Sequence, residues 1–146
     1  GALKNPYAIA AGLAKGVKVG DNAIAALVTR ALAEMVRFWT AMGGRAETFY
    51  GLSGVGDLMT TCFSEHSRNH RVGLALGRGE TLEAIQARTT MVAEGVPNTA
   101  SLYQVARQTG ARTPLLDEIH AVLYAGKAPA LAMRDLLARD PRPEAG

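Results

Sequence analysis

The sequence predicts an all-α fold, a single domain of several helices, and three observations support this prediction. Alanine, the best helix former, is its most frequent residue. No stretch alternates apolar and polar residues between turn dipeptides, so a sheet is not expected. Proline and glycine stand where helices should begin and end, as in the segments that Pro97 and Pro114 open and that Gly110 and Gly126 close.

Length and composition narrow the class of protein. At 146 residues, with 48% hydrophobic and 20% charged residues, the chain suits one domain that buries roughly 70% of its unfolded surface. The single cysteine, Cys62, excludes an internal disulfide framework and favours a reducing compartment, which we take to be the cytoplasm. No apolar run approaches the ~18 residues of a membrane span, so no membrane partner is expected. The formal net charge of +3 is too small and too dispersed to predict nucleic-acid binding.

Local patterns give the boundaries of the expected elements. Helices are expected over residues 2–15, 22–42, 67–76 and 81–88, and from Pro97, Pro114 and Pro129 onward, with Gly16 and Gly20 in the loop after the first. A further helical segment should contain Leu58 and Met59. We expect the helical domain to span residues 1–138 and a polar tail to follow over 139–146. The chain opens without Met and almost at once as a helix, which predicts that it is a fragment of a longer protein.

Residues 22–42 show the strongest helical pattern. Their apolar residues cover most of the circumference, which predicts a central, buried helix. Asp21 is expected to cap it, and a narrow polar strip of Arg30, Glu34 and Arg37 is expected on its remaining surface.

Two charged residues near predicted helix starts, Lys4 and Asp57, are candidate catalytic or substrate-binding residues. Lys4 lies in the first turn of a helix, where the macrodipole favours anions; it is either a solvated lysine or a proton donor whose pKa the dipole and partial burial lower. Asp57 follows Gly51-x-x-Gly54-x-Gly56, which lacks the order and the preceding strand of a dinucleotide fingerprint. Asp57 is therefore either a helix cap or a carboxylate that orients a lysine or a substrate hydroxyl.

Two further segments suit ligand binding. Ser67, Arg68 and Asn69 offer a guanidinium between two small hydrogen-bonding side chains near a helix start, which fits a phosphate group but also fits a capping serine followed by a surface arginine. Glu94 lies in a loop between apolar residues and glycine, where a carboxylate either meets a ligand or is solvated.

Cys62, His66 and His70 follow one another at four-residue spacing. On one continuous helix they would align one sulfur and two nitrogen ligands, but a structural zinc site requires four ligands. Neither Glu65 nor Asp57 would share their face. We expect no metal here, but a buried thiol and two polar surface histidines.

Taken in order, GALKN, GDNA with LVTRALAEM, GLSGVGDL, SRN and VAEGV resemble the C-terminal domain of the bacterial type of NAD(P)-dependent glycerol-3-phosphate dehydrogenase. The resemblance runs from residue 1 to about residue 137. It implies an all-helical domain like the C-terminal domain of 6-phosphogluconate dehydrogenase, with an N-terminal Rossmann domain, absent from this chain, holding NAD or NADP. The implied reaction interconverts glycerol 3-phosphate and dihydroxyacetone phosphate and supplies phospholipid synthesis.

The resemblance also assigns roles to residues of this chain. Lys4 matches the catalytic lysine, which also touches the substrate. The matched substrate contacts are Asp57, Ser67, Arg68 and Asn69. The matched cofactor contacts of this domain are Arg68, Val92 and Glu94. The family uses no metal.

Other assignments remain open at this point. The chain could be the helical domain of a hydroxyacid or 6-phosphogluconate-type dehydrogenase, or a stand-alone helical binding module suggested by its pI of 9.3. The preference for NAD or NADP belongs to the missing domain. The sequence leaves the oligomeric state, including a homodimer, undecided.

Overall fold

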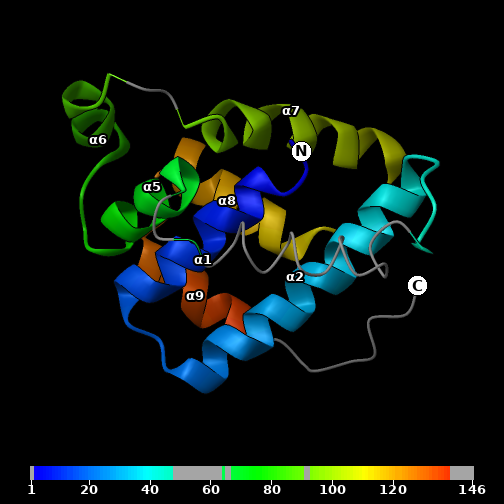
Figure 1. Cartoon of the computed structure of the whole chain (residues 1–146), viewed down its shortest axis with the longest axis horizontal. Helices are drawn as coiled ribbons and strands as arrows, with labels where there is room; N and C mark the ends of the chain where they lie inside the picture. Colours follow the sequence, from blue (N-terminus) through cyan, green and yellow to red (C-terminus); the bar gives the residue numbers. More distant parts are fainter. Residues whose placement is uncertain (1, 48–63, 65–66, 91–92, 139–146) are drawn as a thin grey trace.

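A computed structural model describes residues 2–47, 64, 67–90 and 93–138 of the chain, and all regular elements within these residues are helices. The helices keep the labels of Figure 1. They are α1 (Asn5–Val17), α2 (Asp21–Ala41), α5 (Arg68–Gly77), α6 (Leu82–Arg88), α7 (Gly95–Thr109), α8 (Pro114–Tyr124) and α9 (Pro129–Leu137). The predicted all-α class is confirmed. The expected helical segment around Leu58 and the tail over 139–146 lie outside the described residues.

Several predicted helix starts are confirmed, and others shift by a few residues. Ser67 caps α5 and Thr81 caps α6, each accepting a backbone N–H three residues on. The first helix begins at Asn5 instead of residue 2, after a turn. The cap of α2 is Gly20, and Asp21 is the first helical residue, so the predicted capping role of Asp21 was wrong. The helix expected from Pro97 already begins at Gly95.

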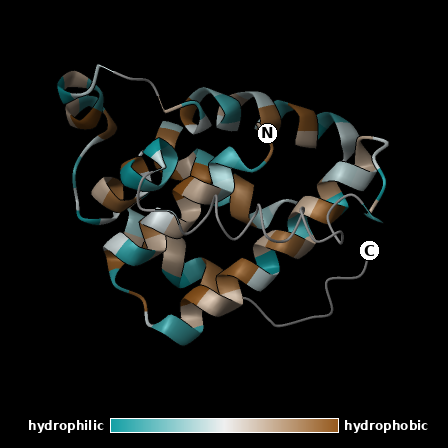
Figure 2. Cartoon of the chain, viewed as in Figure 1, coloured by the Kyte–Doolittle hydropathy of each residue, from teal (hydrophilic) through white to brown (hydrophobic). Residues whose placement is uncertain are grey.

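The central helix is α1, not α2 as predicted. Nine of the thirteen residues of α1 are buried, against five of twenty-one in α2. In Figure 1, α1 lies in the middle of the molecule, α7 crosses above it and α2 runs along the lower right. Apolar and polar segments alternate along α2 in Figure 2, as they do in a helix with one buried face.

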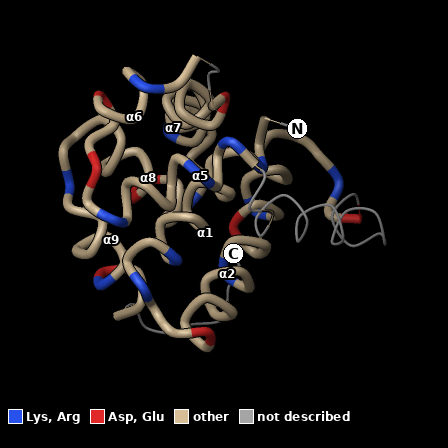
Figure 3. The backbone as a smooth tube through the Cα atoms, turned by 60° about the vertical axis from the view of Figure 1, so that its left-hand side comes forward, with Lys and Arg blue, Asp and Glu red and all other residues tan. Residues whose placement is uncertain are grey.

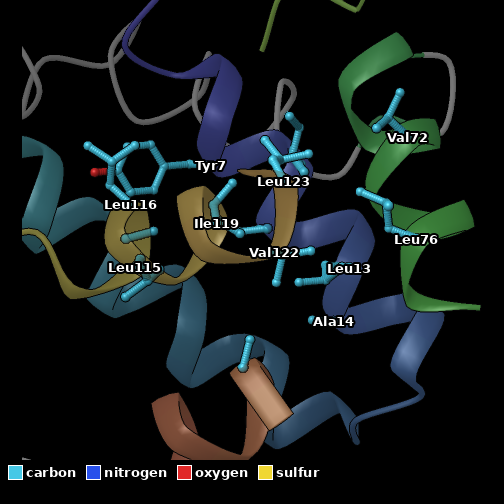
Figure 4. Packing of buried hydrophobic residues seen from close by; sticks show 14 of the residues in the cluster. Tyr7, Leu13, Ala14, Val72, Leu76, Leu115, Leu116, Ile119, Val122 and Leu123 are labelled. Atoms are coloured by element: carbon cyan, nitrogen blue, oxygen red, sulfur yellow. The ribbon is translucent and has the colours of Figure 1, made fainter. Parts of the chain in front are cut away.

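The hydrophobic core lies around α1, with α8 on one side and α5 on another. Figure 4 shows Leu13 of α1 between Val122 of α8 and Leu76 of α5. Tyr7, Leu13, Leu116 and the other core residues are almost fully buried. The α1 helix is thus held between α8 and α5 by close packing.

Glycines allow α1 and α5 to pack backbone against backbone. A Cβ on Gly12 would clash with the carbonyl of His70 and lie 2.8 Å from Leu74 N, and a Cβ on Gly73 would lie equally close to Leu13 N. Gly16 and Gly77 repeat the arrangement one turn later. Gly16, which the sequence placed in a loop, is therefore a helical contact residue. Larger side chains at these positions would separate the two helices.

Candidate functional site

The glycine contacts run in the same order along α1 and α5, so the two helices are parallel. Gly12 faces the first half of α5, and Gly16 faces its end. Parallel packing places the start of α1, where Lys4 lies, beside the start of α5, where Ser67 and Arg68 lie. The two motifs, more than sixty positions apart in the sequence, therefore meet at one end of the domain.

The start of α7 lies at the same end of the domain and contacts the starts of α1 and α5. The backbone N–H of Gly95 donates to Asn69 Oδ1 at 2.8 Å, and a Cβ on Gly95 would lie 2.9 Å from the carbonyl oxygen of Asn5. The side chain of Asn5 donates from Nδ2 to Asn98 Oδ1 at 2.9 Å. The first residues of three helices thus meet, and we call this place the N-terminal junction: Lys4–Asn5, Ser67–Asn69 and Glu94–Gly95.

The electrostatics of the N-terminal junction favour an anion. Each helix N-terminus carries a partial positive charge and backbone N–H groups without intrahelical partners. Like α9, none of the three helices has an acidic residue in its first turn, and the carboxylate of Glu94, at the N-cap of α7, is exposed. Arg68 is exposed at the start of α5 and adds a full positive charge. Together these features suit a phosphate group.

Lys4 is half-buried at the N-cap of α1. Its carbonyl accepts the N–H groups of Tyr7 and Ala8, each at 3.1 Å, so the backbone at Lys4 is fixed by the first helical turn. Lys4 thus has a fixed backbone at the start of a well-packed helix, which suits chemistry that demands a defined position.

In Ser67 and in Asn69 the side-chain oxygen accepts a hydrogen bond from the protein backbone, and the side-chain donor can serve a ligand. Ser67 Oγ accepts the N–H of His70 at 3.3 Å, and its own O–H proton is still available to donate. Asn69 Oδ1 accepts from Gly95, which fixes the amide so that Nδ2 is the donor that a ligand would meet. The capping role of Ser67 and its predicted phosphate contact are therefore compatible.

Glu94 is exposed and directly precedes α7. Its carbonyl accepts the N–H of Asn98 at 3.0 Å, so the backbone at Glu94 is part of the first turn although the side chain makes no capping bond. Asp57 and Val92, the other two predicted contacts, lie outside the described residues. The structure therefore brings together Lys4, Ser67, Arg68, Asn69 and Glu94.

A cleft of about 360 Å³ adjoins the junction beside Arg68. Its walls come from α5, α6 and the segment before α7, and Arg71 and Arg88 lie on them with Arg68. Arg88 pairs with Glu80, with Nη2 3.1 Å from Oε2. Elsewhere basic and acidic residues are mixed over the described chain (Figure 3).

The predicted histidine positions need one correction. His70 is 2% exposed, so it is not the surface histidine that the sequence predicted. Cys62 and His66 lie outside the described residues. Within the part of the chain that the structure describes, no group of three or more His, Cys, Asp or Glu side chains could hold a metal ion.

Glu34 is the largest departure from the sequence prediction. Instead of lying on a polar strip, it is fully buried and accepts three hydrogen bonds: Tyr7 Oη at 2.6 Å, Leu115 N at 2.8 Å and Leu116 N at 3.0 Å. It therefore caps α8 from α2 and ties both helices to α1. Burial raises the pKa of the Glu34 carboxyl to about 7, because the loss of hydration outweighs these hydrogen bonds and the nearby Arg37.

Sequence reasoning also missed Asn98 and Gly95, whose contacts span the junction. The signal for the helix pair was present as Gly12-x-x-x-Gly16 and Gly73-x-x-x-Gly77, a spacing that places both glycines on one helix face. Nothing in the spacing pairs Asn98 with Asn5, because the two residues are 93 positions apart.

Comparison with known proteins gives one family. The family model for the C-terminus of NAD-dependent glycerol-3-phosphate dehydrogenase matches residues 1–134. The chain is 51% identical over 144 residues to "Glycerol-3-phosphate dehydrogenase [NAD(P)+]" of Desulfotalea psychrophila and 48% identical to that of Vibrio vulnificus. Both alignments cover 99% of this chain but 42% of the relative, so the chain spans less than half the length of these proteins.

Solved structures agree with the sequence match. Glycerol-3-phosphate dehydrogenase from Coxiella burnetii superposes with a TM-score of 0.90 at 42% identity, over 95% of this chain and 43% of that one. The enzyme from Saccharomyces cerevisiae gives 0.81 at 27% identity, over 95% and 41%. The chain belongs to the family of C-terminal domains of NAD-dependent glycerol-3-phosphate dehydrogenases.

Proposed function

We propose that this chain is the substrate-binding and catalytic domain of an enzyme that interconverts glycerol 3-phosphate and dihydroxyacetone phosphate with NAD(P)+ or NAD(P)H. The observation that carries the proposal is the N-terminal junction, where Lys4 lies beside a phosphate-binding group of helix starts. The family match supports the substrate, since the relatives carry that enzyme name. A preceding Rossmann domain would hold most of the dinucleotide.

Reduction of the ketone needs a hydride, a proton and a fixed substrate. The nicotinamide supplies the hydride when it is bound. Lys4 donates the proton to the oxygen that develops negative charge, and in the reverse direction it accepts that proton from the C2 hydroxyl. General acid catalysis of this kind contributes ~10²–10⁴-fold.

The phosphate is held by the start of α5. Arg68 makes the charge-assisted, two-pronged contact, and the Ser67 hydroxyl and Asn69 Nδ2 complete the shell. Binding energy from the phosphate, which does not react, then holds the carbonyl carbon in place. Asp57 would orient Lys4 or a substrate hydroxyl.

The described residues fit a dinucleotide that is presented by another domain. Arg68 and Glu94 are both exposed at the junction, where a cofactor held outside this chain can reach them. We assign Arg68, Glu94 and Val92 to contacts with this dinucleotide. The preference for NAD or NADP then depends on the other domain.

The cellular setting is part of the same proposal. Among the described residues, no helix combines the length and the apolar character that crossing a bilayer requires. We place the enzyme in the cytoplasm, where its product would supply glycerol 3-phosphate for phospholipid synthesis, and we leave a homodimer as an open alternative to a monomer.

The test compares the intact protein, with its preceding domain, and the 146-residue chain. Intact protein should oxidise NADH or NADPH when dihydroxyacetone phosphate is added, and the isolated chain should not, because its sequence contains no G-x-G-x-x-G fingerprint to hold a pyrophosphate. An intact protein without this activity would refute the proposed substrate. Turnover by the isolated chain would refute the division of labour between two domains.

A further inference from the structure

We infer that Asn98 is a positioning residue for Lys4. Its side-chain amide holds Asn5 and so fixes the start of α1 against the start of α7. This inference rests on the proposed function, because it concerns the placement of the proposed proton donor. It adds to the reaction a residue of α7 that does not itself need to touch substrate.

The contact is specific and bridges two distant segments. Asn5 Nδ2 donates to Asn98 Oδ1 at 2.9 Å, and both side chains are half-buried. An amide–amide hydrogen bond has a directional donor and acceptor, so it fixes both distance and orientation.

On the α7 side, Asn98 stands on a rigid turn. The N–H of Gly95 is bonded to Asn69, and its carbonyl accepts the buried Thr99 hydroxyl at 2.6 Å. Tyr124 of α8 donates its hydroxyl to the carbonyl of Val96 at 2.6 Å. These bonds tie the first turn of α7 to α5 and α8, so that Asn98 is a fixed reference point.

On the α1 side, Asn5 is the first residue of the helix. Residues 2–4 form a turn, and the N–H of Asn5 reaches only the carbonyl of Ala2, at 3.3 Å. Helix ends fray unless side chains hold them. Asn98 supplies such a restraint one residue after Lys4.

The restraint matters because proton transfer is sensitive to distance. A misplacement of about 1 Å can cost up to ~10²-fold in rate. Without Asn98 the start of α1 would move relative to α5 and α7, and the Lys4 ammonium would move relative to a substrate held by Arg68 and Asn69. The phosphate contacts themselves would stay.

The experiment uses the intact two-domain protein. Asn98→Ala should lower kcat for dihydroxyacetone phosphate about 10-fold, with KM changed less than about 3-fold and the shape of the pH profile unchanged. Exchange of the Tyr7 and Ala8 amides, which donate to the Lys4 carbonyl, should become about 5-fold faster, the effect of losing roughly 1 kcal/mol of hydrogen bonding.

Asn98→Asp is the conservative variant, since a carboxylate oxygen can still accept from Asn5 Nδ2. It should restore kcat to within about 3-fold of wild type. In an Asn5→Ala background, Asn98→Ala should have almost no further effect on kcat, because the two side chains act through one bond.

Arg30→Ala is the matched control. It removes another part-buried bond between helices, from Arg30 Nη1 to the carbonyl of Leu136 at 2.6 Å, away from the junction. It should lower the melting temperature at least as much as Asn98→Ala and leave kcat unchanged.

The inference is wrong if Asn98→Ala retains wild-type kcat, if Asn98→Asp fails to restore it, or if Arg30→Ala lowers kcat equally. A rise in KM with unchanged kcat would make Asn98 a substrate ligand and also overturn it. If the wild-type protein itself does not reduce dihydroxyacetone phosphate, the proposed function fails, and the inference falls with it.

Discussion

The first backbone N–H groups of α8 and those of the three junction helices meet different kinds of acceptor. At α8 the protein provides its own carboxylate: buried Glu34 accepts the N–H groups of Leu115 and Leu116. At α5 and α7 the side-chain acceptors of the first N–H groups are neutral, namely Ser67 Oγ and Asn69 Oδ1, and at α1 the N-cap residue makes no side-chain capping bond. A helix start whose N–H groups bind a carboxylate of the protein itself is part of the scaffold. Helix starts without such a carboxylate keep their positive potential and can bind an external anion.

The difference predicts that variants in the two regions separate activity from stability. Junction variants should affect turnover and leave the fold nearly intact. Variants of the Glu34 group should affect the free energy of unfolding and leave the turnover of the folded fraction nearly unchanged.

The largest effect on turnover is expected at Lys4. In the intact protein, Lys4→Ala should lower kcat by ~10²–10⁴ with a smaller change in KM, because a proton donor is lost and the phosphate contacts remain. Steady-state kinetics with dihydroxyacetone phosphate measure this. A sharp rise in KM with unchanged kcat would instead make Lys4 a phosphate ligand.

The largest effect on stability is expected at Glu34. Glu34→Leu leaves the Tyr7 hydroxyl and the N–H groups of Leu115 and Leu116 buried without an acceptor, which should cost about 3–5 kcal/mol of unfolding free energy. Denaturant titration measures this loss. Glu83→Ala is the control: it removes an acidic residue from the first turn of exposed α6 and should cost less than about 1 kcal/mol. Equal losses would refute the special role of Glu34.

A smaller effect follows from the pKa of Glu34, raised to about 7 by burial. Between the unfolded value of 4.5 and the folded value of about 7, the folded state binds more protons than the unfolded state. The Glu34 contribution is therefore fully present below about pH 4.5 and is lost as pH rises through 7, with a total of up to about 3 kcal/mol.

Unfolding free energies measured from pH 5 to 8 test this trend. Glu34→Gln, which cannot ionise, should remove the corresponding slope. A slope that persists unchanged in Glu34→Gln would assign the titration to another group.

Much of this domain could be predicted from local sequence, and some of it could not. Prolines, capping residues and apolar periodicity indicated most helices, because these features act within a few residues. The central place of α1 was missed, since its Gly12 and Gly16 matter only through contact with Gly73 and Gly77. Burial of Glu34 was missed because its partners come from two other helices.

In the candidate site, too, some residues could be predicted from local sequence and others could not. Lys4, Arg68 and Asn69 were predicted as site residues because each belongs to a short motif and the motifs occur in a known order. Asn98 and Gly95 were not, because their roles arise from contacts across the junction that no local pattern encodes.

The measurement that tests the anion-binding account most directly compares two ketones in wild-type and Arg68→Ala intact protein. For dihydroxyacetone phosphate, Arg68→Ala should lower kcat/KM by ~10–150-fold, the effect of losing a charge-assisted contact of ~1.5–3 kcal/mol, and Arg68→Lys should recover only part of it. For unphosphorylated dihydroxyacetone, a poor substrate throughout, the loss should nearly vanish, with the melting temperature unchanged. An equal loss for both ketones would contradict the account, because Arg68 would then act on the cofactor or the fold and not on the phosphate.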